Sequence, residues 1–277
     1  MRMAGRGLSA GMMVAAMLAV ASPVRADSRW FSPEWFAGPW TVTLGAEGRV
    51  LPTYEGSSNY RFLPVPLFDI RRAGTPRHFQ SPRDGASIGI VEFDNFRLGP
   101  TLKVRLPRRE GDDAKLRGLG DINFAVELGG FAEYWFTPWL RARGELRQGV
   151  SGHHGLTGDL AADVVMPVTP QLTFSGGPRL SFDSGKTMQT YFGVDPAQSV
   201  LSGLPVYNPS GGVRSYGAGV MARYEITPQW ATHLFVEYER LIGSAADSPL
   251  VALRGSRDQV TTGLGVTYSF DVGPLFR

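Results

Sequence analysis

Apolar residues alternate with polar or small residues along many stretches of the chain, each about ten residues long. Successive side chains of an extended strand point to opposite faces, so this alternation predicts strands with one face suited to lipid and the other to a polar interior. A soluble β-sandwich would show the same alternation, and the choice between the two depends on other features. The clearest example is the last stretch, where Val260, Thr262, Leu264, Val266, Tyr268 and Phe270 point one way and the residues between them are Thr, Gly or Ser.

Three short segments with a shared Thr-Pro pattern join pairs of alternating stretches. They are F-T-P-W at 136–139, V-T-P-Q at 168–171 and I-T-P-Q at 226–229. Proline presets a turn conformation and needs no ladder partner where strand pairing stops. These segments therefore predict tight hairpin turns along one rim of a barrel.

The pattern predicts an all-β protein, a single closed antiparallel transmembrane β-barrel. We expect it to close, because closure gives every backbone group in a membrane a partner. Twelve strands are expected, or ten if the two short ones between 71 and 95 merge. An even number places the short turns and both termini on the periplasmic side and the longer connections outside. The expected strands are 40–50, 59–70, 76–81, 85–92, 96–106, 121–136, 138–149, 158–168, 171–182, 213–226, 229–241 and 258–270.

The N-terminus carries the features of an export signal. Arg2 and Arg6 precede an uncharged apolar run over 8–20, and V-R-A follows at 24–26. The run is shorter than the roughly 20 residues of a membrane-spanning helix. This predicts a cleaved signal peptide at 1–26, a barrel over 27–270 and a short C-terminal extension at 271–277. Together with aromatic residues at strand ends, it predicts the outer membrane of a Gram-negative bacterium.

Charge and composition exclude several classes of function. The chain has 28 Lys and Arg against 25 Asp and Glu, but three of the arginines lie in the expected signal peptide, leaving 25 against 25. A formally neutral mature chain gives no reason to expect a nucleic-acid partner. The absence of cysteine removes disulfides, thiolate catalysis and thiolate-bound metals. No cofactor motif is present, so no cofactor is expected.

Charged residues alternate along the two strands on either side of the first Thr-Pro turn. Residues of opposite charge facing one another inside a barrel would pair across strands and fill a narrow lumen. The alternative is a selectivity lining for a small-solute pore. The candidate lumen charges are Glu127, Glu133, Arg141, Arg143, Glu145 and Arg147.

His153 and His154 are the only adjacent histidines, in an expected outward connection. Neighbouring residues of an extended chain point apart, which disfavours a metal site. A hydrolase triad of Ser151, His153 or His154, and Asp159 is disfavoured as well, because no nucleophile motif surrounds the serine. We therefore expect a non-enzymatic protein.

The long connection 183–212 is rich in apolar and aromatic residues, which argues against disorder. We expect it to fold onto the barrel mouth, either as a plug or as a docking surface. The candidate residues for either role are Tyr191, Phe192, Leu204 and Tyr207.

Five segments in order resemble the MipA/OmpV family of outer-membrane proteins. They are P-T-Y-E-G-S at 52–57, L-R-G-L-G-D-I at 116–122, Y-F-G-V at 191–194 with S-G-L-P-V-Y at 202–207, R-L-I-G-S-A-A-D-S-P at 240–249 and Y-S-F at 268–270. A barrel of this type usually ends in the aromatic residue of its last strand, whereas seven residues follow Phe270 here.

The resemblance implies an outer-membrane barrel in contact with lipid and lipopolysaccharide. It further implies a structural or scaffold role that links murein-remodelling enzymes, with a lytic transglycosylase and a penicillin-binding protein as partners. The alternatives are a small-solute pore gated by 183–212 and a surface adhesin.

Overall fold

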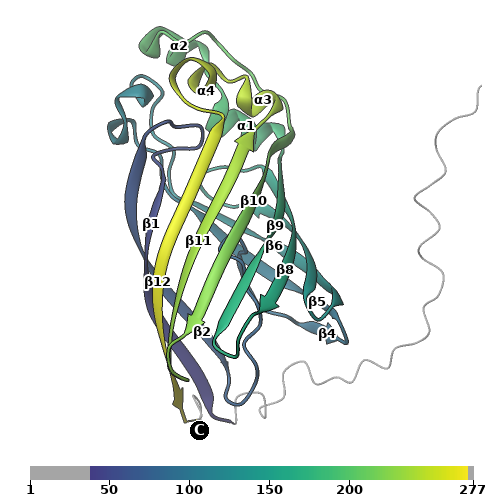
Figure 1. Cartoon of the computed structure of the whole chain (residues 1–277). Helices are drawn as coiled ribbons and strands as arrows, with labels where there is room; N and C mark the ends of the chain where they lie inside the picture. Colours follow the sequence, from purple (N-terminus) through teal and green to yellow (C-terminus); the bar gives the residue numbers. More distant parts are fainter. Residues whose placement is uncertain (1–37, 274–277) are drawn as a thin grey trace, which may run out of the picture.

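The computed structural model describes residues 38–273. The expected signal peptide at 1–26 lies outside the described residues, as do residues 27–37 and 274–277. Figure 1 shows long, tilted strands rising from a rim of short turns to a cap of small helices.

Twelve antiparallel strands form one sheet, which confirms the predicted all-β fold. Two of them, β3 and β4, have only two and three residues, and the others have 10 to 15. The strands are β1 (Trp40–Pro52), β2 (Tyr60–Arg72), β3 (Ala86–Ser87), β4 (Val91–Phe93), β5 (Phe96–Arg105), β6 (Ala125–Thr137), β7 (Leu140–Gly149), β8 (Leu156–Pro167), β9 (Leu172–Asp183), β10 (Gly212–Glu225), β11 (Trp230–Leu241) and β12 (Asp258–Val272).

The predicted Thr-Pro turns connect β6 to β7, β8 to β9 and β10 to β11. In each turn the threonine hydroxyl accepts a bond from a backbone N–H two or three residues on. The donors are Trp139 N to Thr137 Oγ1 at 3.3 Å, Leu172 N to Thr169 Oγ1 at 3.0 Å and Trp230 N to Thr227 Oγ1 at 3.0 Å. Threonine and proline therefore act together, the first holding the turn that the second presets.

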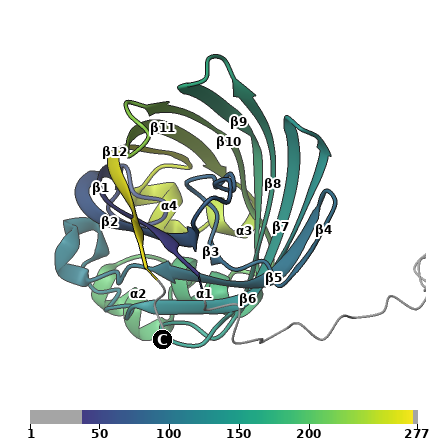
Figure 2. The same cartoon turned by 90° about the horizontal axis from the view of Figure 1, so that it is seen from below.

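The predicted closure is not seen within residues 38–273. The strand order runs from β2 through β1 and β12 round to β5, and β3 and β4 pair only with β5. Figure 2 shows the sheet curled around a hollow, with β2 at one edge and the β3–β4 strands at the other. We call the gap between these two edges the seam.

Two prolines explain why β2 does not pair across the seam. Thr53 N donates to Asn59 O, which fixes the odd-numbered residues of β2 as those bonded to β1. The even-numbered residues, including Pro64 and Pro66, therefore turn their backbone to the free edge. Proline has no N–H to donate, so this edge is blocked as a pairing partner.

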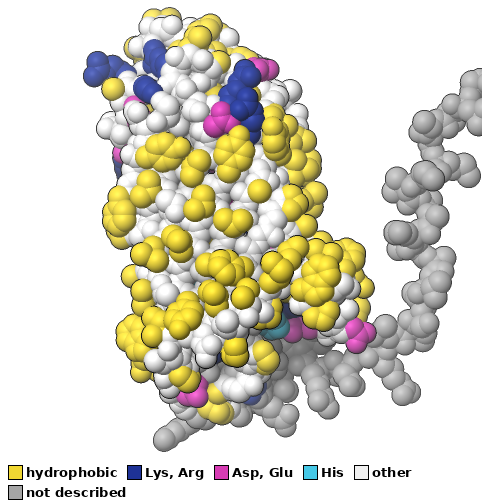
Figure 3. All heavy atoms as spheres, viewed as in Figure 1, with side chains coloured by type: hydrophobic (Ala, Val, Ile, Leu, Met, Phe, Trp, Pro, Cys, Tyr) yellow, Lys and Arg dark blue, Asp and Glu magenta, His cyan; other side chains and the backbone are white. Residues whose placement is uncertain are grey.

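The outer face of the sheet is apolar. Figure 3 shows hydrophobic side chains over the strands of one face, with charged side chains gathered toward the two ends. At the turn rim, aromatic rings lie in pairs: Trp230 and Tyr268 are 4.8 Å apart between centroids, and Tyr134 and Phe136 are 4.9 Å apart. An apolar band with an aromatic border is typical of a sheet that faces lipid.

Small helices form the cap. They are η2 (Glu110–Asp112), η3 (Ala114–Leu116), α1 (Gly185–Phe192), α2 (Pro196–Ser202), α3 (Gly243–Ala246) and α4 (Pro249–Arg254). Two clusters of buried apolar residues hold them together over the strand ends. No helix within residues 38–273 is long and apolar enough to cross a membrane.

Candidate functional site

The six charged residues predicted from the sequence lie side by side in the interior. β6 supplies the two glutamates at 127 and 133, and β7 supplies the four residues at 141, 143, 145 and 147. Each is at most 7% exposed. The alternation of β7 turns every second side chain inward, and the Thr-Pro turn brings β6 opposite in register.

Arg141 contacts three carboxylates. It donates to Asp163 at 2.6 Å, to Asp84 at 2.8 Å and to Glu133 at 3.2 Å. Arg143 donates to Glu133 at 3.2 Å and to Glu145 at 2.7 Å. Because each guanidinium is shared among carboxylates and each carboxylate among guanidiniums, the charges neutralise one another.

The same network spreads around the barrel wall. Arg147 donates to Glu127 at 3.0 Å and also to Glu145 and Asp159. Further ion pairs extend the ladder from two strands to the strands from β5 to β11. The additional members are Lys103, Arg105, Arg179, Asp183, Arg214 and Glu239.

An internal segment, residues 76–85, runs through the hollow of the sheet. β2 ends at the turn rim with Arg72, whereas β3 pairs with the upper half of β5 through Ala86 and Leu102. The connection therefore climbs the length of the interior. This corrects the prediction of a strand at 76–81, and the strand predicted at 85–92 is split into β3 and β4.

Charged and aromatic side chains of the internal segment join the network. Arg83 pairs with Glu239 at 3.0 Å and donates to Ser181 at 2.8 Å. Asp84 accepts from Arg141, and the Phe79 ring centroid lies 4.5 Å from the Arg141 guanidinium. The segment thus crosses the interior with three side chains, Arg83, Asp84 and Phe79, that each contact an oppositely charged or cationic side chain of the strands.

The interior formed by residues 38–273 holds a lower and an upper cavity. The lower one of about 440 Å³ lies toward the turn rim between the internal segment and strands β1, β2 and β11, with His78 and His233 on its wall. The upper one of about 460 Å³ lies beneath the cap and is lined by β1, β2, β5, β11 and β12. Residues of the internal segment line the lower cavity, and its Arg83 pairs with Glu239, which lines the upper one.

The His153 ring contacts Glu127 and Tyr191 rather than the side chains of the other two residues of the triad considered above. Its Nε2 is 3.0 Å from Glu127 Oε1, and its ring packs edge-on against Tyr191 at 5.6 Å. Ser151 Oγ donates to Phe124 O, and Asp159 accepts from Arg147, so the three residues do not form a triad. Residues 38–273 also contain no cluster of three or more metal-ligating side chains.

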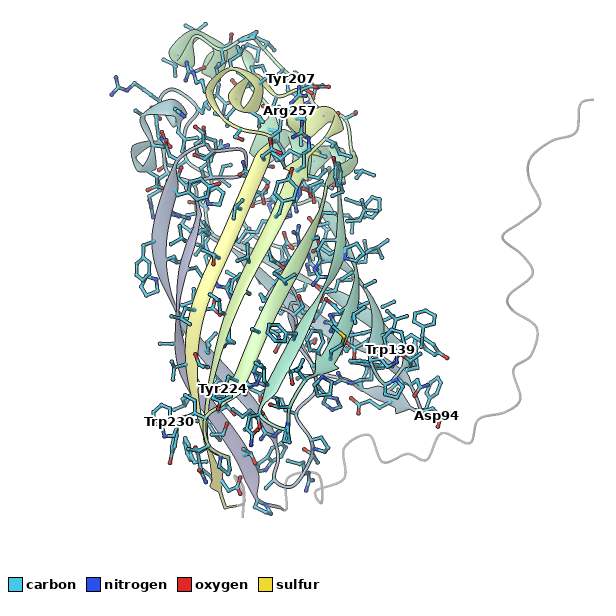
Figure 4. All side chains as sticks on the ribbon, viewed as in Figure 1. Asp94, Trp139, Tyr207, Tyr224, Trp230 and Arg257 are labelled. Atoms are coloured by element: carbon cyan, nitrogen blue, oxygen red, sulfur yellow. The ribbon has the colours of Figure 1, made fainter. Side chains whose placement is uncertain are left out.

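The four apolar residues predicted in 183–212 are all part of the cap. Tyr191 and Phe192 end α1 in one buried cluster, and Leu204 lies in the other, with Tyr207 packed against it. The Tyr207 hydroxyl donates to Ser244 O at 2.8 Å. Figure 4 places Tyr207 and Arg257 at the cap end, opposite Trp139, Tyr224 and Trp230 at the turn rim.

Comparison with known sequences identifies the family. The profile of a family described as "MltA-interacting protein MipA" matches residues 44–270. The chain belongs to this family. Two relatives, both named MltA-interacting protein, come from Escherichia coli K12 and Shigella flexneri; each is 28% identical over 228 residues, covering 67% of this chain and 89% of the relative.

Solved structures resemble this member of the MipA family only weakly. The NanC porin is 9% identical with a TM-score of 0.41, over 83% of this chain and 98% of that one. The COG4313 outer-membrane channel from Pseudomonas putida F1 is 13% identical with a TM-score of 0.42, over 89% of this chain and all of that one.

Most of the segments that carry the resemblance to the MipA family meet in the cap. Tyr54, Leu119, Val194 and Leu204 come from three of the five segments and share one buried cluster. The internal segment is the part that sequence reasoning missed. The sequence feature that could have revealed it is the polar cluster of Ser81, Arg83 and Asp84, which is too polar for a strand that faces lipid.

Proposed function

We propose that this chain is a sealed, non-enzymatic outer-membrane β-barrel that serves as a scaffold for a murein-remodelling enzyme. The observation that carries the proposal is membership of the MipA family, whose profile is named for interaction with MltA. The partner expected from that name is a lytic transglycosylase of the MltA type. A penicillin-binding protein is the second partner that the family resemblance implies.

The structure of the interior favours a scaffold role rather than a pore. A pore needs a continuous polar path, and here the internal segment crosses the hollow with its charges paired to the wall. The outer apolar band supports insertion in a membrane. An export signal before the barrel would place the turn rim in the periplasm, on the same side as murein.

The test is capture of a purified MltA-type transglycosylase by the refolded mature chain in non-ionic detergent. An unrelated outer-membrane barrel in the same detergent is the negative control. An insertion of a bulky peptide after Pro170, in a rim turn, should reduce capture, whereas the same insertion after Gly203, at the end of α2, should not. Failure of the folded wild-type chain to capture the enzyme would overturn the proposal.

A surface adhesin is the second candidate, because the cap exposes apolar side chains. Val200 and Leu201 on α2 and Leu253 on α4 are 84%, 73% and 68% exposed. Exposed apolar groups at the outward end favour contact with another surface. Binding of cells that display the barrel to host-derived surfaces, lost on Leu201→Ser with Leu253→Ser, would support this role over the scaffold.

A further inference from the structure

The upper cavity combines apolar residues with charged ones, among which arginines outnumber glutamates. Leu63 and Val65 of β2 line it on one side of the seam and Val104, at the outer edge of β5, on the other, and Leu51 and Leu241 also belong to the lining. Its charged lining comprises four arginines, at 49, 61, 105 and 108, and two glutamates, Glu55 and Glu239, both of which are paired with arginines. The neighbouring inward positions of β6 and β7 are mostly charged, whereas the inward Leu63 and Val65 offer an apolar surface that matches hydrocarbon.

Arg108 is a buried cation without a carboxylate partner among the described residues. It is 6% exposed, its Nη1 donates to Tyr191 O at 2.9 Å, and its Nε has no partner. Burial lowers the pKa of Arg108 to about 10, because the loss of water outweighs the attraction of Tyr54, Tyr191, Glu55 and Asp121, none of which forms an ion pair with it. Buried charges are normally paired, so this guanidinium lacks the anion that such a site requires.

Hydroxyl groups beside Arg108 are unpaired as well. The hydroxyls of Tyr54 and Tyr191 are buried and have no hydrogen-bond partner, and both side chains line the same cavity. Two hydroxyl donors and a guanidinium on one wall form the donor set that binds a phosphate. Arg61 adds a second cation, whose nearest acid, Asp112, is 4.0 Å away.

The seam connects this cavity with the apolar outer face. No ladder joins β2 to β3, β4 or β5 in the described residues, and the prolines at 64 and 66 leave the β2 edge without two donors. Phe62 and Val104 are exposed on the outer surface beside it. A hydrocarbon chain lying between Leu63 and Val104 would need to displace no backbone hydrogen bond.

We propose that the upper cavity binds a phosphate-bearing lipid, with the phosphate at Arg108, Tyr54 and Tyr191 and the acyl chain leaving through the seam into the membrane. This inference rests on the proposed membrane location and is independent of the transglycosylase partner. It assigns the seam a role, as the passage for the chain of a bound lipid.

The test measures lipid retention by native mass spectrometry on the mature chain folded in dodecyl maltoside micelles. Three probes separate the parts of the ligand: oleoyl lysophosphatidic acid, mono-oleoylglycerol with the same chain, and glycerol 3-phosphate with the same headgroup. We expect the first to bind at least about tenfold more tightly than either of the others, because only it uses both walls.

Matched variants locate the site. Arg108→Gln should weaken lysophosphatidic acid binding about tenfold or more, whereas Arg109→Gln, at an exposed neighbour, should not change it. Val65→Trp should block the apolar wall, and Phe68→Trp, on the outward face of the same strand, is its control. Heat-modifiable migration on gels verifies that each variant is folded.

The outcomes distinguish this inference from the proposed function. Equal binding of lysophosphatidic acid and mono-oleoylglycerol, or equal effects of the Arg108 and Arg109 variants, would overturn the lipid site in a folded barrel. Tight binding of glycerol 3-phosphate alone would reduce the site to one for a free anion and also overturn it. Failure of the chain to insert in vesicles would instead count against the membrane location itself.

Discussion

At the scale of single residues, the interior depends on Arg141. Its loss would leave Asp84, Glu133 and Asp163 close together without the cation that they share. Removing one member of a buried ion network costs about 3–5 kcal/mol, because the remaining charges stay buried and unpaired. We expect Arg141→Ala to lower the free energy of unfolding by this amount, measured by urea titration of the barrel in phospholipid vesicles.

The control is an ion pair of similar length on the surface. Arg240 and Asp258 are 2.6 Å apart, with side chains 40% and 49% exposed. Solvent screens such a pair, and its loss costs about 0–1 kcal/mol. Equal destabilisation by Arg240→Ala and Arg141→Ala would show that the internal network does not carry the stability assigned to it.

A second residue-scale prediction concerns pH. Burial opposes ionisation of Asp113, but bonds from Lys115 N, Asn59 and Thr53 outweigh it and lower the pKa below the ordinary value of 3.8. A depressed acid pKa stabilises the fold above the ordinary value, and this contribution is lost as the pH falls through the lowered one. The cap loops should therefore loosen in acid below pH 3.8.

Hydrogen exchange at the Lys115 amide reports this loosening. Asp113→Ala should raise that exchange already at pH 7, by an amount that corresponds to about 1–3 kcal/mol of local opening. Its exchange should then show no further acid-dependent step beyond the intrinsic pH dependence. An acid step of the same size in this variant would exclude Asp113 as its origin.

At the scale of elements, alternation was sufficient to locate the ten long strands but not what lies between β2 and β5. Alternation of apolar and polar residues reveals a strand that has one face toward lipid and one toward the interior. Residues 76–85 lie inside the sheet and have no face toward lipid. Their contacts, such as Arg83 with Glu239, join positions far apart in the sequence. Local patterning carries no information on such contacts, which form only after the sheet has curled.

The helices of the cap were missed for a related reason. α1 has eight residues and α2 seven, too short for a helical period to be distinguished from irregular structure. The apolar content of 183–212 correctly indicated packing, and Tyr191 and Phe192 are buried. The open seam had a signal in the sequence, since Pro64 and Pro66 within one strand mark an edge.

The internal segment gives a prediction at this scale. We expect the wild-type barrel to be silent in a planar bilayer, because Arg83 and Asp84 tie the segment across the hollow. Replacing 76–84 with a Gly/Ser linker of the same length should produce steady single-channel openings. Replacing α2, residues 196–202, in the same way should leave the barrel silent, since α2 lies on the outer side of the cap.

Comparing the two replacements shows whether the internal segment or the cap closes the barrel to ions. Openings after the α2 replacement alone would assign the seal to the cap, as the sequence suggested for 183–212. Steady openings of the wild-type chain would contradict sealing altogether and favour the small-solute pore.

At the scale of the whole molecule, the open seam sets this sheet apart from a closed barrel. In a closed barrel only every second residue of a strand meets lipid. The chain has no native cysteine, so single introduced cysteines can be labelled without background. On β11, away from the seam, we expect a lipid-soluble maleimide in vesicles to label Leu234→Cys, which is outward, but not Phe235→Cys, which is 2% exposed.

β2 should behave differently because its inner face borders the seam. We expect the same reagent to label both Phe62→Cys and Leu63→Cys, since the first side chain faces lipid and the second faces the cavity that the seam opens. A charged maleimide, which does not enter the bilayer, should label neither efficiently. If Leu63→Cys were as inert as Phe235→Cys, β2 would be paired with β5 in the membrane. The barrel would then be closed there, and hydrocarbon would have no lateral path to Arg108.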